Sequence, residues 1–193
     1  VPERFMQARR SPGRIGEGPD QGAAQHRERP GLHREGREKK CLTLLVPILF
    51  EQDYCDAGCQ GVLGPIRANA MKAGAFRKGT WGGEIIDELK PTKQDIVVEG
   101  KRTLDAFHST NIDFLLRVNC IRNVAFCGLL TNVCTEGTAR SAYDKGYKVF
   151  LLKDCCAAAS SEEQKYVEEK FFPYIGDVLT HDGIRTNGYA LPQ

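Results

Sequence analysis

Two residues in this sequence of 193 stand where a thiol nucleophile could be activated. Cys134 follows an apolar segment at 123–127 and a turn at 128–132, so we expect it in the first turn of a helix. A helix N-terminus carries partial positive charge and unpaired N–H groups, which favour a thiolate and can bind an oxyanion. Lys101 follows another apolar segment, and its ammonium would lower the pKa of a neighbouring thiol further. The pattern indicates a cysteine nucleophile, although a small buried structural cysteine fits the position of Cys134 as well.

Strands buried on both faces of a sheet are typically continuous apolar runs. Such runs occur at 42–50, 96–98, 123–127 and 147–152, with a short edge-strand candidate at 177–179. Helix signals separate them: a capping box at 110–113, a helix that starts near Thr131 or Asn132 and stops at Gly146, and a capping box at 160–164. Strands joined through helices pair in parallel, so the sequence predicts an α/β fold, a three-layer α/β/α Rossmann-like parallel sheet. Chemistry in such sheets lies at the carboxyl ends of the strands.

Composition excludes several classes of protein. The formal net charge of +2 argues against a dedicated nucleic-acid binder, and no apolar run approaches the roughly 18 residues of a membrane span. Eight cysteines are scattered through a chain too long to need disulfides for stability, and no signal peptide precedes them. We therefore expect reduced thiols and a cytoplasmic protein.

The first forty residues differ from the rest. They hold eight Arg, two Lys, five Glu and one Asp, a local charge of +4, and no apolar periodicity. A segment of this composition cannot bury enough apolar surface to offset its ordering entropy. We expect residues 1–36 to be a disordered leader and residues 37–193 to be the folded domain.

Four stretches resemble the isochorismatase-like cysteine hydrolases in order and spacing, over roughly residues 37–184. They are KGTWGGEIIDELKP at 78–91, GKRTLDAFHSTN at 100–111, VAFCGLLTNVCTEGTARSAYDKGY at 124–147 and DCCAAAS at 154–160. The resemblance implies hydrolysis of an amide or related C–N bond in a small molecule, without a cofactor, by a homo-oligomer.

The resemblance also assigns roles to residues. Cys134 matches the family's nucleophile and Lys101 its catalytic lysine, while the backbone N–H groups of Leu130 and Cys134 match the oxyanion hole. The family has a cis peptide at the position of Leu129–Leu130. Trp81 and Phe107 match aromatic positions near the substrate pocket, and packing in the core explains them equally well.

The sequence departs from the family at its start. Members open with an apolar strand that ends in the catalytic Asp, followed two residues later by Gln. Asp20 is the only Asp before residue 42, and no apolar run precedes it. We therefore expect the sheet to lack its first strand, through a frameshift, a wrong exon or a truncation. Loss of a general base costs roughly 10²–10⁴ in rate, so we expect an impaired hydrolase. The alternative is an inactive relic or small-molecule-binding protein on the same fold.

Metal sites are not expected from the sequence. The nicotinamidase branch of the family places one Asp and several His after its second strand, whereas residues 47–60 here contain no His. Cys55 and Cys59 have a spacing that zinc could use, but no His lies near them in sequence. No glycine-rich phosphate loop opens a helix after a strand, so no nucleotide is implied.

Overall fold

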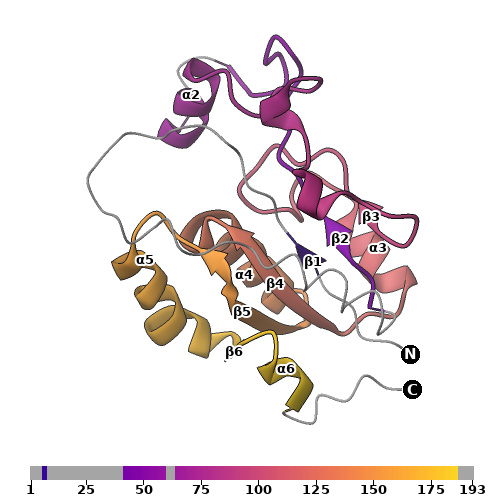
Figure 1. Ribbon diagram of the computed structural model, residues 1–193, viewed down its shortest axis with the longest axis vertical. Coiled ribbons are helices and arrows are strands. Elements are labelled where there is room, and N and C mark those ends of the chain that lie inside the picture. The colour runs from indigo at the N-terminus through magenta and orange to yellow at the C-terminus, as the bar shows by residue number, and fades with distance from the viewer. Residues whose placement is uncertain (1–5, 8–40, 60–63, 187–193) are drawn as a thin grey trace.

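The computed structural model describes residues 6–7, 41–59 and 64–186 (Figure 1). Six strands form one sheet in the order β3-β2-β1-β4-β5-β6, and each recorded pairing is parallel. This arrangement confirms the predicted α/β class with a parallel sheet. The strands are β1 (Met6–Gln7), β2 (Leu44–Leu45), β3 (Ile96–Val97), β4 (Asn123–Leu129), β5 (Lys148–Ala157) and β6 (Gly176–Leu179).

The expectation that the sheet lacks a first strand is wrong in one respect, because β1 occupies the central position. Met6 is paired with Leu44 of β2 on one side and with Phe126 of β4 on the other. Backbone pairing needs no particular side chain, and an unfilled centre would leave two strand edges exposed. The strand consists of two residues, Met6 and Gln7, with arginines on either side in the sequence. A strand this short contains no apolar run, so the sequence pattern did not predict it. The predicted disorder of the rest of 1–36 lies outside the described residues.

The helical segments lie largely where the sequence signals predict, but the expected cap at Thr131 or Asn132 is wrong, because the Thr131 hydroxyl donates to Gln164 and the turn has no side-chain cap hydrogen bond. Ser160 accepts a hydrogen bond from the Glu163 N–H at 3.2 Å, as its capping box requires. Gly146, with φ of +84°, follows the helix expected to stop there. Pro65–Lys72 was not expected to be helical. The helices are α2 (Pro65–Lys72), α3 (Ile112–Val118), α4 (Glu136–Asp144), α5 (Ser161–Tyr166) and α6 (Gly183–Thr186).

Irregular helical turns extend two of these helices. A π-helical turn at Thr131–Thr135 leads directly into α4, and another at Val167–Phe171 continues α5. Arg140 of α4 lies over the Phe171 ring at 3.7 Å, so the two helical segments pack against each other. None of the described helices is long and apolar enough to cross a membrane. All eight cysteines are described, and none forms a disulfide.

The hydrophobic core is built on the two long strands. The inner residues of β4 are buried without interruption, and Phe126 and Phe150 are at most 2% exposed. Leu116 of α3 and Ala139 of α4 belong to the same cluster. The core therefore fixes β4 and β5, and with them the turns that follow their carboxyl ends.

Substitution of Gly176 tests the close contact between β5 and β6. A Cβ at this position would lie 2.2 Å from the Val149 carbonyl oxygen. Gly176→Ala should therefore lower the free energy of unfolding by about 1–3 kcal/mol, since the strand backbone must move. Gly64→Ala is the control, because nothing lies within 4 Å of its Cβ position. Equal urea midpoints for the two variants would contradict this packing.

Candidate active site

The loop after β3 carries Lys101 into the protein interior. Gly100 adopts φ of +88°, which reverses the chain just before the lysine. The Lys101 carbonyl accepts a hydrogen bond from Leu49 N–H at 3.3 Å, so its backbone is fastened to the segment after β2. The side chain is only 3% exposed, and its Nζ donates to the Thr103 carbonyl at 2.7 Å. A buried ammonium held in this way is a functional candidate rather than a solvated surface charge.

Cys134 lies in the turn that follows β4. The Leu129–Leu130 peptide bond is cis, as the family resemblance implies. The Leu130 carbonyl then accepts hydrogen bonds from Val133 N–H at 3.1 Å and Thr135 N–H at 3.2 Å, which close the π-helical turn around the cysteine. The Cys134 side chain is half-buried. π-Helical turns inserted in helices are frequent at functional sites, and this one presents the thiol at the carboxyl end of the sheet.

Lys101 and Cys134 interact electrostatically. Burial lowers the pKa of Lys101 below its ordinary value, while contact with the Cys134 sulfur and the charge of Asp105 act in the opposite direction. The structure thus brings together the two residues that the sequence placed on separate loops. An ammonium in contact with a thiol stabilises the thiolate, the form that attacks carbonyl carbons.

Two polar residues that the sequence analysis missed hold this arrangement. The Thr138 hydroxyl donates to the Cys134 carbonyl at 2.7 Å and accepts from Ala106 N–H at 3.1 Å, so it ties the nucleophile's helix to the lysine loop. Gln164 of α5 accepts a hydrogen bond from the Thr131 hydroxyl at 2.6 Å. The four-residue spacing of Thr138 from Cys134 is a known backbone-bonding pattern and could have been noticed. No sequence signal pairs Thr131 with Gln164.

Asp56, in the loop after β2, is hydrogen-bonded to Arg102, the residue that follows Lys101. We call this contact the Asp56–Arg102 brace. One Asp56 oxygen accepts from Glu51 N–H at 2.9 Å, and the other is hydrogen-bonded to Arg102 Nε. Burial raises the pKa of Asp56, but these hydrogen bonds and the Arg102 charge outweigh it and hold the pKa below its ordinary value. The carboxylate is therefore the form that stabilises this contact.

The aromatic candidates do not lie together. Trp81, in the short turn Trp81–Gly83, is 71% exposed, which contradicts the core-packing explanation for it. Phe107 packs on the core, with its ring 6.1 Å from that of Tyr147. Leu130 lies directly before the Thr131–Thr135 turn that contains Cys134.

The described residues offer Cys134 no carboxylate partner by hydrogen bond. Asp105 influences Lys101 by its charge, but its own oxygens accept from Phe107 N–H at 2.8 Å and the Ser141 hydroxyl at 2.6 Å. Strand β1 contributes Met6 and Gln7, neither of which is acidic.

The residues after β2 do not fit the metal site of the nicotinamidase branch. No His occurs in 47–60, and the Asp56 carboxylate is engaged by Arg102. Cys55 and Cys59 are both exposed, whereas Cys155 and Cys156 are both buried, so no four-cysteine cluster forms.

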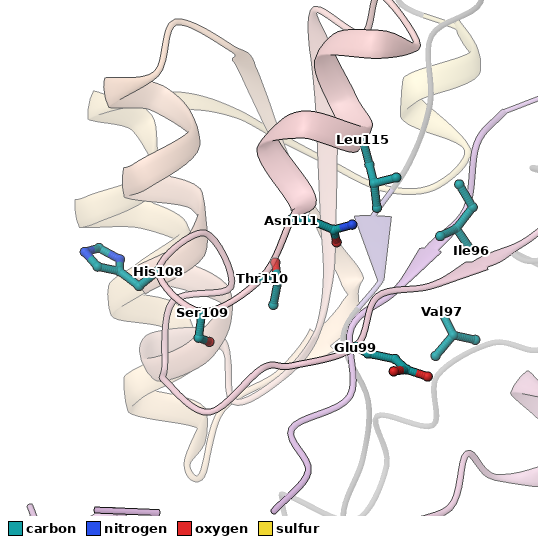
Figure 2. A pocket seen from close by; sticks show the side chains of 8 residues that line it. All are labelled: Ile96, Val97, Glu99, His108, Ser109, Thr110, Asn111 and Leu115. Carbon is teal, nitrogen blue, oxygen red and sulfur yellow. The ribbon is translucent and has the colours of Figure 1, made fainter. Parts of the chain in front are cut away.

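An open groove of about 760 Å³ runs beside β3 (Figure 2). Figure 2 shows Ile96 and Val97 of β3 on one side and the 108–111 loop on the other. Neither Lys101 nor Cys134 lines it, so the groove is separate from the thiol.

Substitution of Lys101 tests its contact with the thiol. Lys101→Met should slow alkylation of Cys134 by iodoacetamide about tenfold or more near neutral pH, because the thiolate loses its neighbouring cation. Lys153→Met, at an exposed position of β5, is the control. The rate is measured by mass mapping after brief, sub-stoichiometric treatment, in which wild-type Cys134 should be the most reactive of the eight thiols.

Cys55 should react slowly although it is exposed, because a hydrogen bond to Asp53 raises its pKa. If Lys101→Met leaves the alkylation rate of Cys134 unchanged, Lys101 does not stabilise the Cys134 thiolate.

Substitution of Asp56 tests the brace through its pH dependence. The pKa of Asp56 is lower in the folded than in the unfolded state, so its stabilisation is fully present above the ordinary value of 3.8 and is lost as the pH falls through the folded pKa. Asp56→Asn should cost about 1–2 kcal/mol in the free energy of unfolding at pH 7. The difference from wild type should shrink in urea titrations below pH 3.8. Glu169→Gln is the control, because Glu169 is exposed and forms no ion pair within the part of the chain that the structure describes. Its difference from wild type should not change with pH. A pH-independent difference for Asp56→Asn would contradict the assignment.

Comparison with known families places this geometry in context. The isochorismatase domain family matches residues 34–183. The ureidoacrylate amidohydrolase RutB of Agrobacterium fabrum is 34% identical over 148 residues, which cover 70% of this chain and 64% of that protein. The RutB of Acinetobacter baylyi is 35% identical over 141 residues, covering 66% of this chain and 57% of its own length. The chain thus spans about three fifths of these curated relatives.

Solved structures share the fold. An isochorismatase family protein from Burkholderia thailandensis superposes with a TM-score of 0.74 at 21% identity, covering 95% of this chain and 96% of that one. The N-carbamoylsarcosine amidase of Thermoplasma acidophilum gives 0.70 at 22% identity, covering 94% and 98%. The sheet and its helices therefore form a three-layer α/β/α architecture.

Proposed function

Because the chain belongs to the isochorismatase family, we propose that it is a cysteine hydrolase that cleaves a C–N bond of a small amide, with Cys134 as nucleophile. The observation that carries this proposal is the contact between the Cys134 thiol and the buried Lys101 ammonium at the carboxyl ends of the strands. A buried cation costs free energy unless a partner compensates it, and the thiolate is such a partner.

The reaction follows from these positions. The Cys134 thiolate attacks the carbonyl carbon of the substrate, and the resulting oxyanion accepts hydrogen bonds from the N–H groups of Leu130 and Cys134. The C–N bond then breaks, the leaving amine takes its proton from solvent water, and an acyl or carbamoyl thioester remains on Cys134. Water hydrolyses the thioester and regenerates the thiol.

The substrate we propose is a ureido compound. A ureidoacrylate amidohydrolase and an N-carbamoylsarcosine amidase, both among the similar proteins, are named for ureido-type substrates. Asn132 supports this choice, because its Oδ1 is buried without a hydrogen-bond partner among the described residues and lies two residues before the nucleophile. An amide oxygen in this position suits the N–H groups of a ureido substrate.

We further propose that the chain turns over slowly, because the described residues of β1 place no carboxylate where the family has its catalytic Asp. Met6, Gln7 and their neighbours Phe5 and Ala8 carry no carboxylate, so strand β1 does not supply the base. Attack by the existing thiolate fraction needs no base, but activation of water for thioester hydrolysis does. The thioester should therefore accumulate on Cys134.

Restoring the base tests this proposal. Replacement of residues 1–36 by an apolar strand ending in Asp-x-Gln and a short helix should raise ammonia release from ureido compounds by about 10²–10⁴, the usual contribution of general acid–base catalysis. The gain should disappear when the new Asp is changed to Asn. Intact mass spectrometry of the unmodified chain should show a Cys134 adduct that is absent from Cys134→Ala.

The opposite outcomes separate the alternatives. Rapid turnover by the unmodified chain would show that a carboxylate reaches the site from elsewhere. Reversible ligand binding without an adduct, and without a gain from the restored Asp, would favour a small-molecule-binding relic.

The proposed location is the cytoplasm. The chain has eight cysteines, none of them in a disulfide, and thiols persist in a reducing compartment. A homo-oligomer is proposed by family resemblance, and light scattering of the full chain would measure it.

A further inference from the structure

Three side chains of metal-ligand types converge beside the end of β6, two of them from within β5. Leu152 of β5 is paired with Leu179 of β6, so two residues further along each chain Asp154 lies beside His181. His181 N–H donates to Asp154 Oδ1 at 2.9 Å, and its ring Nδ1 lies 2.5 Å from Oδ2. The Cys155 Sγ is 3.7 Å from Asp154 Oδ1. The donor atoms of all three side chains lie within 4.8 Å of one another.

The donor set suits zinc. Thiolate, imidazole and carboxylate are its three usual protein ligands, bound at about 2.0–2.3 Å. Tetrahedral geometry at those bond lengths separates a sulfur and an oxygen ligand by about 3.6 Å, which matches the Cys155–Asp154 separation. Imidazole and carboxylate ligands need about 3.3 Å, whereas His181 Nδ1 lies 2.5 Å from the other oxygen, Oδ2, so the Asp154 carboxylate must turn to offer one oxygen to a metal that Cys155 and His181 also bind.

A second carboxylate, that of Asp182, lies next to the other ring nitrogen of His181. Asp182 Oδ1 lies 3.3 Å from Nε2 of His181, on the side of the ring away from Asp154. Metal-binding histidines usually donate their other ring N–H to such a carboxylate, which fixes the tautomer that leaves the first nitrogen to the metal. Asp182 is in the outer position of such a site.

We propose that Asp154, Cys155 and His181 form a Zn²⁺ site, with water as the fourth ligand. Binding releases the Cys155 thiol proton, while a proton on Nδ1 of neutral His181 moves to Nε2 beside Asp182, so affinity should rise with pH. The sequence pattern predicts no metal at these residues, because His181 lies 26 positions after Cys155.

The site is distinct from the proposed active site. It joins β5 to the segment after β6, whereas Cys134 follows β4. Cys155 is 3% exposed and the His181 side chain 10%, so the ligands are shielded while the Asp154 side chain, 22% exposed, leaves an entry route. Zinc at this point should fasten α6 to the sheet and raise the melting temperature.

Zinc titration of the full chain tests the proposal. The protein is prepared with Cys55→Ser and Cys59→Ser to remove the exposed thiol pair, treated with a chelator and kept in a non-thiol reductant. Calorimetry should show one Zn²⁺ per chain, and Co²⁺ should give a thiolate charge-transfer band. Both signals should be lost in Cys155→Ser and His181→Gln, and the melting temperature should no longer respond to zinc.

Two further variants provide controls. Cys156→Ser should bind as tightly as the parent, because the Cys156 Sγ donates instead to the Phe126 carbonyl. Asp182→Asn, at a position whose side chain is 66% exposed, should fold normally and bind about 10–100-fold more weakly. Failure of the parent to bind zinc, or equal binding by Cys155→Ser and Cys156→Ser, would overturn the proposal.

Discussion

Parallel pairing of all six strands brings their carboxyl ends to one edge of the sheet, and the chemistry of this protein depends on that constraint. Lys101 follows β3 and Cys134 follows β4, so two residues more than thirty positions apart meet without any local sequence signal. The order of strands reverses between β1 and β4, and an open crevice is expected at such a reversal. The turn that carries Cys134 follows β4, one of the two strands at this reversal.

Burial of the Lys101 ammonium makes the two loops depend on each other. The charge is stabilised by the Thr103 carbonyl and the Cys134 sulfur, so movement of either loop would leave it uncompensated. Thr138 limits that movement by bonding to both loops, and Gln164 holds the far side of the nucleophile turn. Hydrogen bonds of this kind hold a reactive group in place because each fixes a rotamer or a backbone direction.

The central strand of the sheet, β1, is very short, so the sheet has few backbone hydrogen bonds at its centre. β1 contributes only Met6 and Gln7, whereas its neighbour β4 has seven residues. A pairing this short fills the gap between β2 and β4, and neither of its two described residues is acidic. The placement of Cys134 depends on β4 and the helix after it, whose positions do not rest on the two residues of β1.

The sequence alone determined the class of fold, the long strands β4 and β5 and the Ser160 helix cap, and it singled out Cys134 and Lys101 as the candidate site. These features are local: apolar runs, capping boxes and family motifs are read within a few residues. The tertiary structure decided what depends on pairing between distant segments, namely the central place of β1, the exposure of Trp81, the Thr138 and Gln164 bridges, and the convergence of Asp154 with His181. Each arises from backbone register or packing across the sheet, which the order of residues along one strand does not specify.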